Sequence, residues 1–370
     1  MSAPRFEVLR THAGGARLGR LTLSHGVVDT PAFMPVATHG SVKGLTPAQL
    51  GEVGATIVLS NAYHLAQRPG VEVVTALGGL HALMGWSRPI LTDSGGFQVM
   101  SLAGLVRVDD DGVRYRSHID GREGVLRPED AVAVQEALGV DVAMSLDECV
   151  PASASPEEVT RAVARTSAWA ARGLAARRRA DMALFGIVQG GLDASLRAES
   201  AAALLALPFD GYAVGGLSVG EPPEDTARVA AETVRLLPEA APRYMMGMGT
   251  PRDLIRFAGL GYDLFDCVLP TRNGRNGMLF TREGRLMIRN ARHARDPRPL
   301  DESCTCYACT HFSRGALRHL ALAKEMLAAQ LATLHNLHFY LRLMREIRDD
   351  LAAGTFPARA REAAGAWAVA

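Results

Sequence analysis

The chain repeats one unit through most of its length: a short apolar run, a polar or glycine-rich turn, and an Ala- and Leu-rich stretch with helical periodicity. Eight such runs occur, at Ala32–Val36, Thr56–Ser60, Ile90–Thr92, Val140–Leu146, Ala183–Val188, Tyr212–Val214, Tyr244–Gly247 and Leu264–Leu269. Strand-like runs that alternate with helices predict a parallel sheet covered by helices, and eight repeats are typical of a (β/α)8 barrel. We therefore predict an α/β fold, a parallel (β/α)8 TIM barrel, with its active site at the carboxyl ends of the strands.

Two segments interrupt this repeat. Residues Val106 to His118 alternate apolar and polar side chains around an Asp-Asp-Asp-Gly turn, which predicts an inserted β-hairpin. Residues Thr271 to His311 are rich in Arg and turn residues, and amphipathic helical sequence follows from Ala316 to about Ala353. The 370 residues suffice for two domains or for one elaborated barrel, and the alternation favours the single barrel.

Three of the five cysteines, Cys304, Cys306 and Cys309, lie within six residues. This spacing lets three thiolates converge on one ion, and a structural zinc site takes four ligands. The fourth ligand is expected among His311, His319, His335 and His338; the first of these is too close to Cys309 to reach the ion without a cramped loop. Four protein ligands leave no open position, so the zinc is expected to be structural; the alternative is three thiols without a metal.

These features predict one domain over residues 1–370, with a zinc-binding subdomain at about 271–340. No apolar run approaches the ~18 residues that span a bilayer, so we expect no membrane segment. The stretch from Met1 to Arg10 lacks the apolar part of a secretion signal, and an odd number of cysteines fits a reducing compartment. We therefore expect a cytoplasmic protein.

Acidic and glycine-rich segments follow five of the predicted strands. They are Thr92–Gln98 with Asp93, Asp147–Cys149, Gln189–Gly191, Gly215–Glu221, and Asp266 with the residues after it. A single acid at a strand end often caps the next helix, but five such segments on one barrel face predict a pocket. Asp147 and Gln189 offer the acceptors and donors that the edge of a heterocycle requires. Asp93 and Asp266 form a carboxylate pair suited to breaking a glycosidic bond through a covalent intermediate, although the spacing does not tell which plays which role.

An Arg-rich segment follows Asp266 directly. From Arg272 to Arg298 there are eight Arg and two acids, about six net positive charges in 27 residues, although the whole chain carries only +1. Arg with Asn and Gly suits contacts with phosphate close to the pocket. The segment therefore predicts a docking surface for a polyanion, with a solvated surface loop as the alternative.

Taken together, these motifs resemble those of the bacterial tRNA-guanine transglycosylases (queuine tRNA-ribosyltransferases) over nearly the whole chain. The matching stretches are TDSGGFQ (92–98), DEC (147–149), VQGG (188–191), GGLSVGE (215–221), FDCVLPTRNGRNG (265–277) and C-x-C-x2-C-x25-H. The resemblance implies exchange of guanine at the wobble position of certain tRNAs for a 7-deazaguanine base. It also implies that Asp266 is the nucleophile and Asp93 the general acid/base.

The resemblance assigns the remaining site residues as well. The substrate-binding residues would be Asp93, Ser94, Gly95, Gly96, Phe97, Asp147, Gln189, Gly216 and Leu217. The RNA-contacting loops would be 247–253 (Gly247, Met248, Gly249, Thr250, Pro251, Arg252 and Asp253) and 271–275 (Thr271, Arg272, Asn273, Gly274 and Arg275). One structural Zn²⁺ per chain would be held by Cys304, Cys306, Cys309 and His335. Homodimerisation is implied by the family, and no nucleotide cofactor is expected.

Two details of the motifs concern the substrate. Val219 and Cys149 resemble the bacterial form, whose incoming base is the aminomethyl-deazaguanine precursor. Phe97 departs from the Tyr that many bacterial members carry, so stacking is kept and a phenolic hydrogen bond is lost. The main alternative function is a non-catalytic tRNA-binding subunit of the same family, which the presence of both aspartates disfavours. A zinc hydrolase would need an open metal position, and a plain RNA-binding barrel would show no base exchange.

Overall fold

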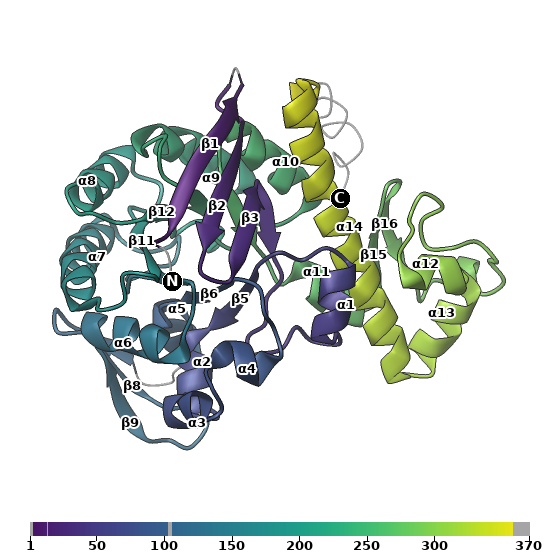
Figure 1. Cartoon of the computed structure of the whole chain (residues 1–370), viewed down its shortest axis with the longest axis horizontal. Helices are drawn as coiled ribbons and strands as arrows, with labels where there is room; N and C mark the ends of the chain where they lie inside the picture. The colour runs from purple at the N-terminus through teal and green to yellow at the C-terminus, as the bar shows by residue number, and fades with distance from the viewer. Residues whose placement is uncertain (1–2, 13, 103–105, 358–370) are drawn as a thin grey trace.

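The computed structural model describes residues 3–12, 14–102 and 106–357, and within these an eight-stranded parallel sheet forms the centre of the molecule (Figure 1). Its strands are β4 (Ala32–Met34), β5 (Val58–Asn61), β6 (Ile90–Asp93), β10 (Val142–Met144), β11 (Ala183–Val188), β12 (Gly211–Val214), β13 (Arg243–Met245) and β14 (Leu264–Asp266). They pair in the order β4-β14-β13-β12-β11-β10-β6-β5, and a bridge between Val36 and Leu59 joins the two edges. The predicted barrel is confirmed, and each predicted run overlaps one strand.

Alternating side chains fill the barrel interior. In β11 every residue is buried, and Ala183, Phe185 and Ile187 belong to the interior cluster, whereas Leu184 and Val188 join the outer core beneath the helices. A strand that is buried on both faces reads as a continuous apolar run, which is why these segments are recognisable in the sequence. The interior is therefore a packed core, and substrate has access only at the ends of the strands.

A three-stranded antiparallel sheet covers the amino-terminal end of the barrel. It consists of β1 (Arg5–Thr11), β2 (Arg17–Leu23) and β3 (Gly26–Thr30). Leu21, Leu23 and Val28 pack into the same cluster as the interior barrel residues. Because this end is filled, only the carboxyl end remains for a pocket.

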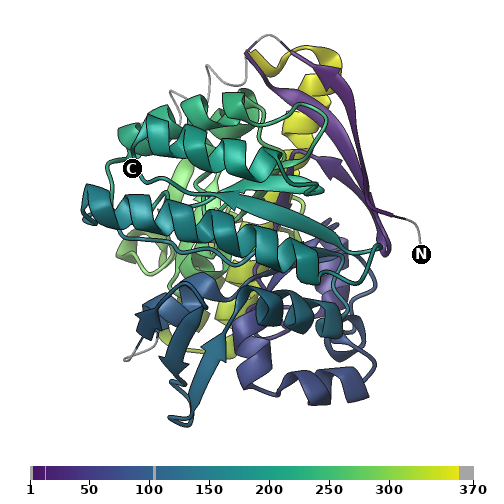
Figure 2. The ribbon, with the colours of Figure 1, turned by 90° about the vertical axis from the view of Figure 1, so that its left-hand side faces the viewer.

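The outer layer consists of the helices that follow the strands. They are α1 (Pro47–Glu52), α2 (Ala62–Gln67), α3 (Val71–Ala76), α4 (Leu80–Met84), α5 (Gly96–Leu102), α6 (Pro128–Leu138), α7 (Pro156–Ala176), α8 (Ala194–Leu205), α9 (Pro223–Thr233), η1 (Val234–Leu236) and α10 (Pro251–Leu260). Helices α7 and α8 lie side by side and face the viewer in Figure 2. None of the helices in the described part of the chain is long and apolar enough to span a bilayer.

The insertion after β6 is larger than the predicted hairpin. Strands β7 (Val106–Val108) and β8 (Val113–Arg116) form that hairpin, and β9 (Glu123–Leu126) adds a third antiparallel strand. The third strand was missed because its exposed and half-buried residues lack a clear apolar alternation.

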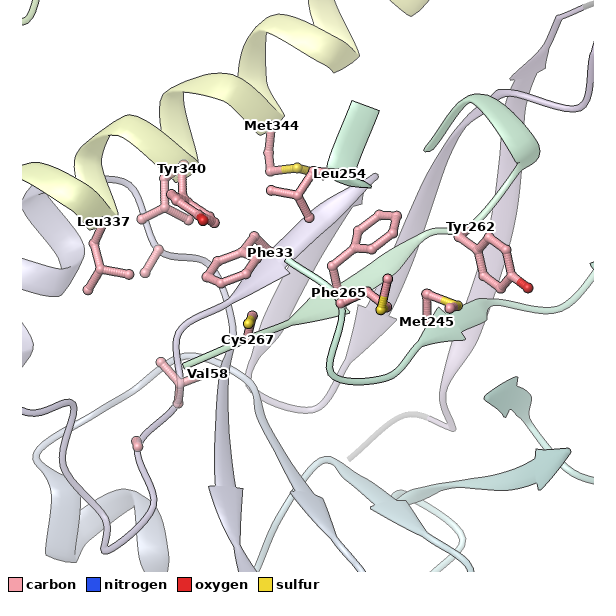
Figure 3. Close-up of a cluster of buried hydrophobic side chains, with 14 of the residues drawn as sticks. Phe33, Val58, Met245, Leu254, Tyr262, Phe265, Cys267, Leu337, Tyr340 and Met344 are labelled. Carbon is pink, nitrogen blue, oxygen red and sulfur yellow. The ribbon is translucent and has the colours of Figure 1, made fainter. Parts of the chain in front are cut away.

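The carboxyl-terminal part packs on one side of the barrel. It contains α11 (Leu269–Arg275), the hairpin of β15 (Met278–Thr281) and β16 (Gly284–Met287), η2 (Ala291–His293), α12 (Tyr307–His311), α13 (Arg314–Leu322) and α14 (Met326–Ala353). Helix α14 runs between the barrel and the elements β15, β16, α12 and α13 (Figure 1). Its residues Leu337, Tyr340 and Met344 face the side chains of the barrel wall in Figure 3, and the rings of Tyr340 and Phe33 lie 5.0 Å apart.

One prediction for this part is confirmed and one was wrong. The helical residues predicted from 316 to about 353 form two helices, separated at Lys324, whose φ of +59° lies in the left-handed region. Residues 271–275, expected as a loop, are helical, because Pro270 stands in the first turn and the buried face of α11 packs on α14. A Cβ on Gly274 would lie only 3.0 Å from the backbone of Ala332, so the two helices approach closely at this glycine.

Candidate active site and metal centre

The carboxyl ends of three strands bring the predicted aspartates together. Asp93 is the last residue of β6, Asp266 is the last residue of β14, and Asp147 follows β10 by three residues. Asp93 and Asp147 are buried and Asp266 is half-buried. The charges of both Asp266 and Asp147 raise the pKa of Asp93, so the three carboxylates share one electrostatic environment. The structure thus brings together the acids that the sequence placed on one face of the barrel.

Asp93 is held by the residues that follow the neighbouring strand. The side-chain amide of Asn61 donates to Oδ2 of Asp93, and the backbone N–H of Ala62 donates to Oδ1 at 3.0 Å. Burial raises the pKa of Asp93 to about 7, and the nearby carboxylates add to this effect while the two hydrogen bonds oppose it. A carboxyl group with a pKa near 7 exchanges protons readily at neutral pH, which suits a general acid/base.

Asp266 has different partners. The hydroxyl of Tyr244 donates to Oδ1 of Asp266 at 2.6 Å, and the backbone N–H of Gly247 donates to the same oxygen at 2.7 Å. Burial raises the pKa of Asp266, whereas both hydrogen bonds favour the ionised form. Because Oδ1 accepts both bonds, Oδ2 is the oxygen available for attack on an electrophilic carbon.

Asp147 and Gln189 form the pair expected to read a heterocycle. Nε2 of Gln189 donates to Oδ2 of Asp147 at 2.6 Å, and burial raises the pKa of Asp147 to about 6. Gly215 and Gly216 lie against this pair: a Cβ on Gly215 would be 2.7 Å from Nε2 of Gln189, and one on Gly216 would overlap its Oε1. A side chain at Gly215 or Gly216 would therefore collide with the amide of Gln189, so both positions need glycine for Gln189 to keep its place.

The segment after β6 completes the wall beside the three acids. Gly95 has φ of +86°, and a Cβ there would lie 2.9 Å from Cβ of Tyr63. A Cβ on Gly96 would lie 2.8 Å from the carbonyl oxygen of Asp147. Ser94 is buried, but Phe97 is 51% exposed. Leu217 is buried at the start of a loop in which the backbone N–H of Val219 donates to Glu221.

Three residues of this site were missed in the sequence. Asn61 follows the second strand, so the strand-end signal used for the other residues could have identified it. Tyr244 is a polar-tipped side chain within an apolar run, a weaker signal. Arg197 on α8 is 1% exposed and donates to the carbonyl oxygens of Val188, Gly191, Gly215 and Gly216, so it joins the two glycine turns. Nothing in the sequence around Arg197 indicates this role.

The predicted RNA-contacting residues differ in accessibility. Gly247, Arg252 and Arg272 are exposed; Thr250, Asp253, Asn273 and Arg275 are half-buried; Met248, Gly249, Pro251, Thr271 and Gly274 are buried. Thr250 and Asp253 form a capping box that starts α10, so the loop of the first segment ends at Thr250. The side chains free to contact RNA are therefore chiefly Arg252, Arg272 and Arg275.

Cys304, Cys306, Cys309 and His335 form one cluster, whose ligand atoms all lie within 4.8 Å of one another. Nδ1 of His335 is 3.8, 3.5 and 3.2 Å from the three sulfurs in chain order. A tetrahedral zinc with bonds of about 2.3 Å to sulfur and 2.0 Å to nitrogen would place these atoms about 3.5 Å apart. Nε2 of His335 lies 2.8 Å from the carbonyl oxygen of Phe280, which fixes the ring with Nδ1 toward the sulfurs.

The other candidate histidines do not complete this cluster. His338 lies 3.4 Å from the sulfur of Cys304, with no comparable approach to the other two sulfurs in the described structure. His311 and His319 are outside the cluster. The donor set of three thiolates and one imidazole fits a closed zinc site, and His335 is its fourth member.

Comparisons with known proteins agree with this site. The family model described as "Queuine tRNA-ribosyltransferase" matches residues 12–368. The queuine tRNA-ribosyltransferase of Moorella thermoacetica is 53% identical over 355 residues, covering 96% of this chain and 95% of the relative. That of Aromatoleum aromaticum is 53% identical over 361 residues, covering 96% of each chain, and that of Thiobacillus denitrificans is 51% identical, covering 95% and 96%. The barrel, the three converging aspartates, the Cys3His cluster and this full-length similarity lead to one conclusion: the chain belongs to the queuine tRNA-ribosyltransferase family.

Proposed function

We propose that this protein is a tRNA-guanine transglycosylase, which exchanges guanine at the anticodon wobble position of tRNA for a 7-deazaguanine base. The observation that carries the proposal is the pairing of Asp93, with its pKa near 7, and Asp266, with one oxygen free, at the open end of the barrel. Family membership supplies the reaction class. A non-catalytic subunit would have no need for two neighbouring carboxylates with raised pKa values.

In the proposed reaction Oδ2 of Asp266 attacks the anomeric carbon of the target ribose. The bond between this carbon and guanine breaks, and guanine departs with a proton from Asp93. The deazaguanine base then attacks the same carbon, displaces Asp266 and returns a proton to Asp93. Two displacements restore the original configuration of the ribose, and protons and electron pairs balance over the cycle.

Base recognition in this proposal uses the residues around the carboxylate pair. Asp147 and Gln189 hydrogen-bond to the edge of the base, Gly216 and Leu217 contribute backbone groups, and Ser94, Gly95 and Gly96 form the wall beneath it. Phe97, being exposed, stacks on the base from the open side. The base must leave its stack to enter, which costs less in an anticodon loop than in a duplex.

The remaining assignments concern RNA, metal and organisation. We propose that residues 247–253 and 271–275 contact the tRNA, with Arg252, Arg272 and Arg275 as the accessible cations. Cys304, Cys306, Cys309 and His335 would hold one structural zinc ion, which supplies stability because no coordination position stays open. In this reading residues 1–370 are one barrel domain with a zinc-binding subdomain at about 271–340. Homodimerisation and a cytoplasmic location stay predictions from the sequence.

The test is exchange of labelled guanine into tRNA, with and without the aminomethyl-deazaguanine precursor. Wild-type protein is expected to exchange both bases. Asp266→Asn keeps the size of the side chain and removes the nucleophile, so exchange should fall below detection while tRNA binding is kept. Unimpaired exchange by this variant would exclude Asp266 as the nucleophile.

A further inference from the structure

A polar cavity lies in the carboxyl-terminal part, outside every residue assigned above to catalysis, base recognition or metal binding. The β15–β16 turn, the segment from 292 to 298 and the start of α13 enclose a volume of about 320 Å³. The side chains that carry its chemistry are Arg285, Arg292, His293, Asp296, Arg298 and Arg314. Five of these six side chains carry a formal charge.

The cavity has an excess of positive charge. Four guanidinium groups face two carboxylates, Glu283 and Asp296, which leaves a formal charge of +2. Asp296 pairs with the other two arginines: its carboxylate accepts from Nε and Nη2 of Arg298 at 3.0 and 2.9 Å and from Arg314 at 3.4 Å. Arg285 and Arg292 form no ion pair with any residue that the structure describes. Arg285 and Arg292, both exposed, thus line the cavity outside any ion pair among the described residues.

His293 adds a buried donor without an acceptor. It is 3% exposed, and its Nε2 lies 3.3 Å from Nε of Arg292. Arginine can only donate, so Nε2 accepts and the neutral ring carries its proton on Nδ1. Nδ1 is buried and has no hydrogen-bond partner among the described residues, since Oδ2 of Asp296 is 3.7 Å away. Burial, with the charges of Arg292 and Arg314, lowers the pKa of His293 and outweighs the opposing effect of Asp296, which keeps the ring neutral.

We propose that this cavity binds a phosphate group through Arg285, Arg292 and Nδ1–H of His293. An oxyanion with several acceptor oxygens offers partners to the two guanidinium groups that form no ion pair and to the unpaired imidazole donor. The phosphate that we favour is a phosphodiester of the tRNA backbone, because the same Arg-rich segment carries Arg272 and Arg275 on α11. This source rests on the proposed function, and it extends the RNA surface onto the zinc-binding subdomain.

The test compares tRNA binding by wild-type protein, Arg285→Ala, Arg292→Ala and a matched control. Arg235→Ala serves as the control, since Arg235 is exposed on η1 and lies outside the cavity. Each cavity variant should bind tRNA about tenfold more weakly, the usual effect of losing one charge-assisted contact. The slope of log affinity against log salt should become shallower by about 0.7–0.9. Zinc content and melting temperature, measured alongside, should match wild type.

A second arm titrates inorganic phosphate into each protein by calorimetry, without RNA. Phosphate binding that disappears in both cavity variants, with unchanged tRNA affinity, would support the phosphate site and overturn the backbone as its source. Unchanged binding of both tRNA and phosphate would overturn the proposal. If wild-type protein binds tRNA through Arg285 and Arg292 but exchanges no base, the proposed function fails while this site stands.

Discussion

Replacement of Gly216 by alanine tests the geometry of the base site most directly. Gly216 has φ of +63°, and a Cβ there would overlap Oε1 of Gln189. The side chain of Gln189 must therefore move, and it is the residue whose Nε2 donates to Asp147 at 2.6 Å. One methyl group should thus disturb the recognition pair without touching Asp93 or Asp266.

The effect of Gly216→Ala has two parts. A left-handed backbone costs an alanine about 1–2 kcal/mol, which lowers the free energy of unfolding. Loss of the hydrogen bond to the carboxylate of Asp147 removes about 1.5–3 kcal/mol from the interaction that positions the pair. If the base is read by Asp147 and Gln189 together, its binding should weaken about 10- to 150-fold.

The control for this variant is Gly139→Ala. Gly139 ends α6 with φ of +78°, and a Cβ there would meet no atom within 4 Å, so this variant carries the backbone strain alone. Both variants should melt below wild type, but only Gly216→Ala should raise KM for the base in the labelled-guanine assay. Equal KM values for the two variants would refute the assignment of Gln189 and Asp147 to base recognition.

The remaining predictions concern Asp93 and the metal centre. Because the pKa of Asp93 is raised to about 7 by burial, the folded protein holds a proton that the unfolded chain releases, so this group costs stability as pH rises from about 4 to 7. Asp93→Asn should therefore abolish base exchange yet be more stable than wild type at pH 8, by about 1–4 kcal/mol, with the difference vanishing near pH 4 in urea unfolding. A pH-independent difference would contradict the pKa shift. Cys309→Ser should hold less than one zinc per chain by atomic absorption and melt earlier, and chelation of wild type should remove activity only as fast as the protein unfolds. Immediate loss with an intact fold would instead indicate a catalytic metal.

The barrel could be predicted because burial on both faces leaves a strong pattern. Each strand is a short apolar run, and each run is followed by helical sequence, so the alternation survives even where a strand has three residues, as in β10 or β14. The inserted sheet and α11 were described less well for the opposite reason. Strand β9 is half-exposed, and α11 contains Asn and Gly, whose helical state depends on packing against α14 rather than on propensity.

The site was predictable to the extent that its residues stand at strand ends. Asp93, Asp147, Gln189 and Asp266 share that position, and the parallel sheet alone brings them to one face. Their partners follow no such rule. Tyr244 lies within β13, and Arg197 lies on the outer helix α8. In an Arg-rich chain the sequence does not distinguish this buried arginine from the exposed ones.

The surroundings of Asp93 and Asp266 distinguish two carboxylates of identical chemistry. Asp93 and Asp266 both stand at strand ends and both accept two hydrogen bonds. Burial and anionic neighbours favour the protonated form of Asp93, although its two hydrogen bonds, which go to different oxygens, oppose this effect. The two bonds to Asp266 converge on one oxygen and leave the other without a hydrogen bond from the described residues. The proposed division of roles, with proton transfer by Asp93 and attack by Asp266, therefore rests on these surroundings, and a sequence motif that names only the acids cannot provide it.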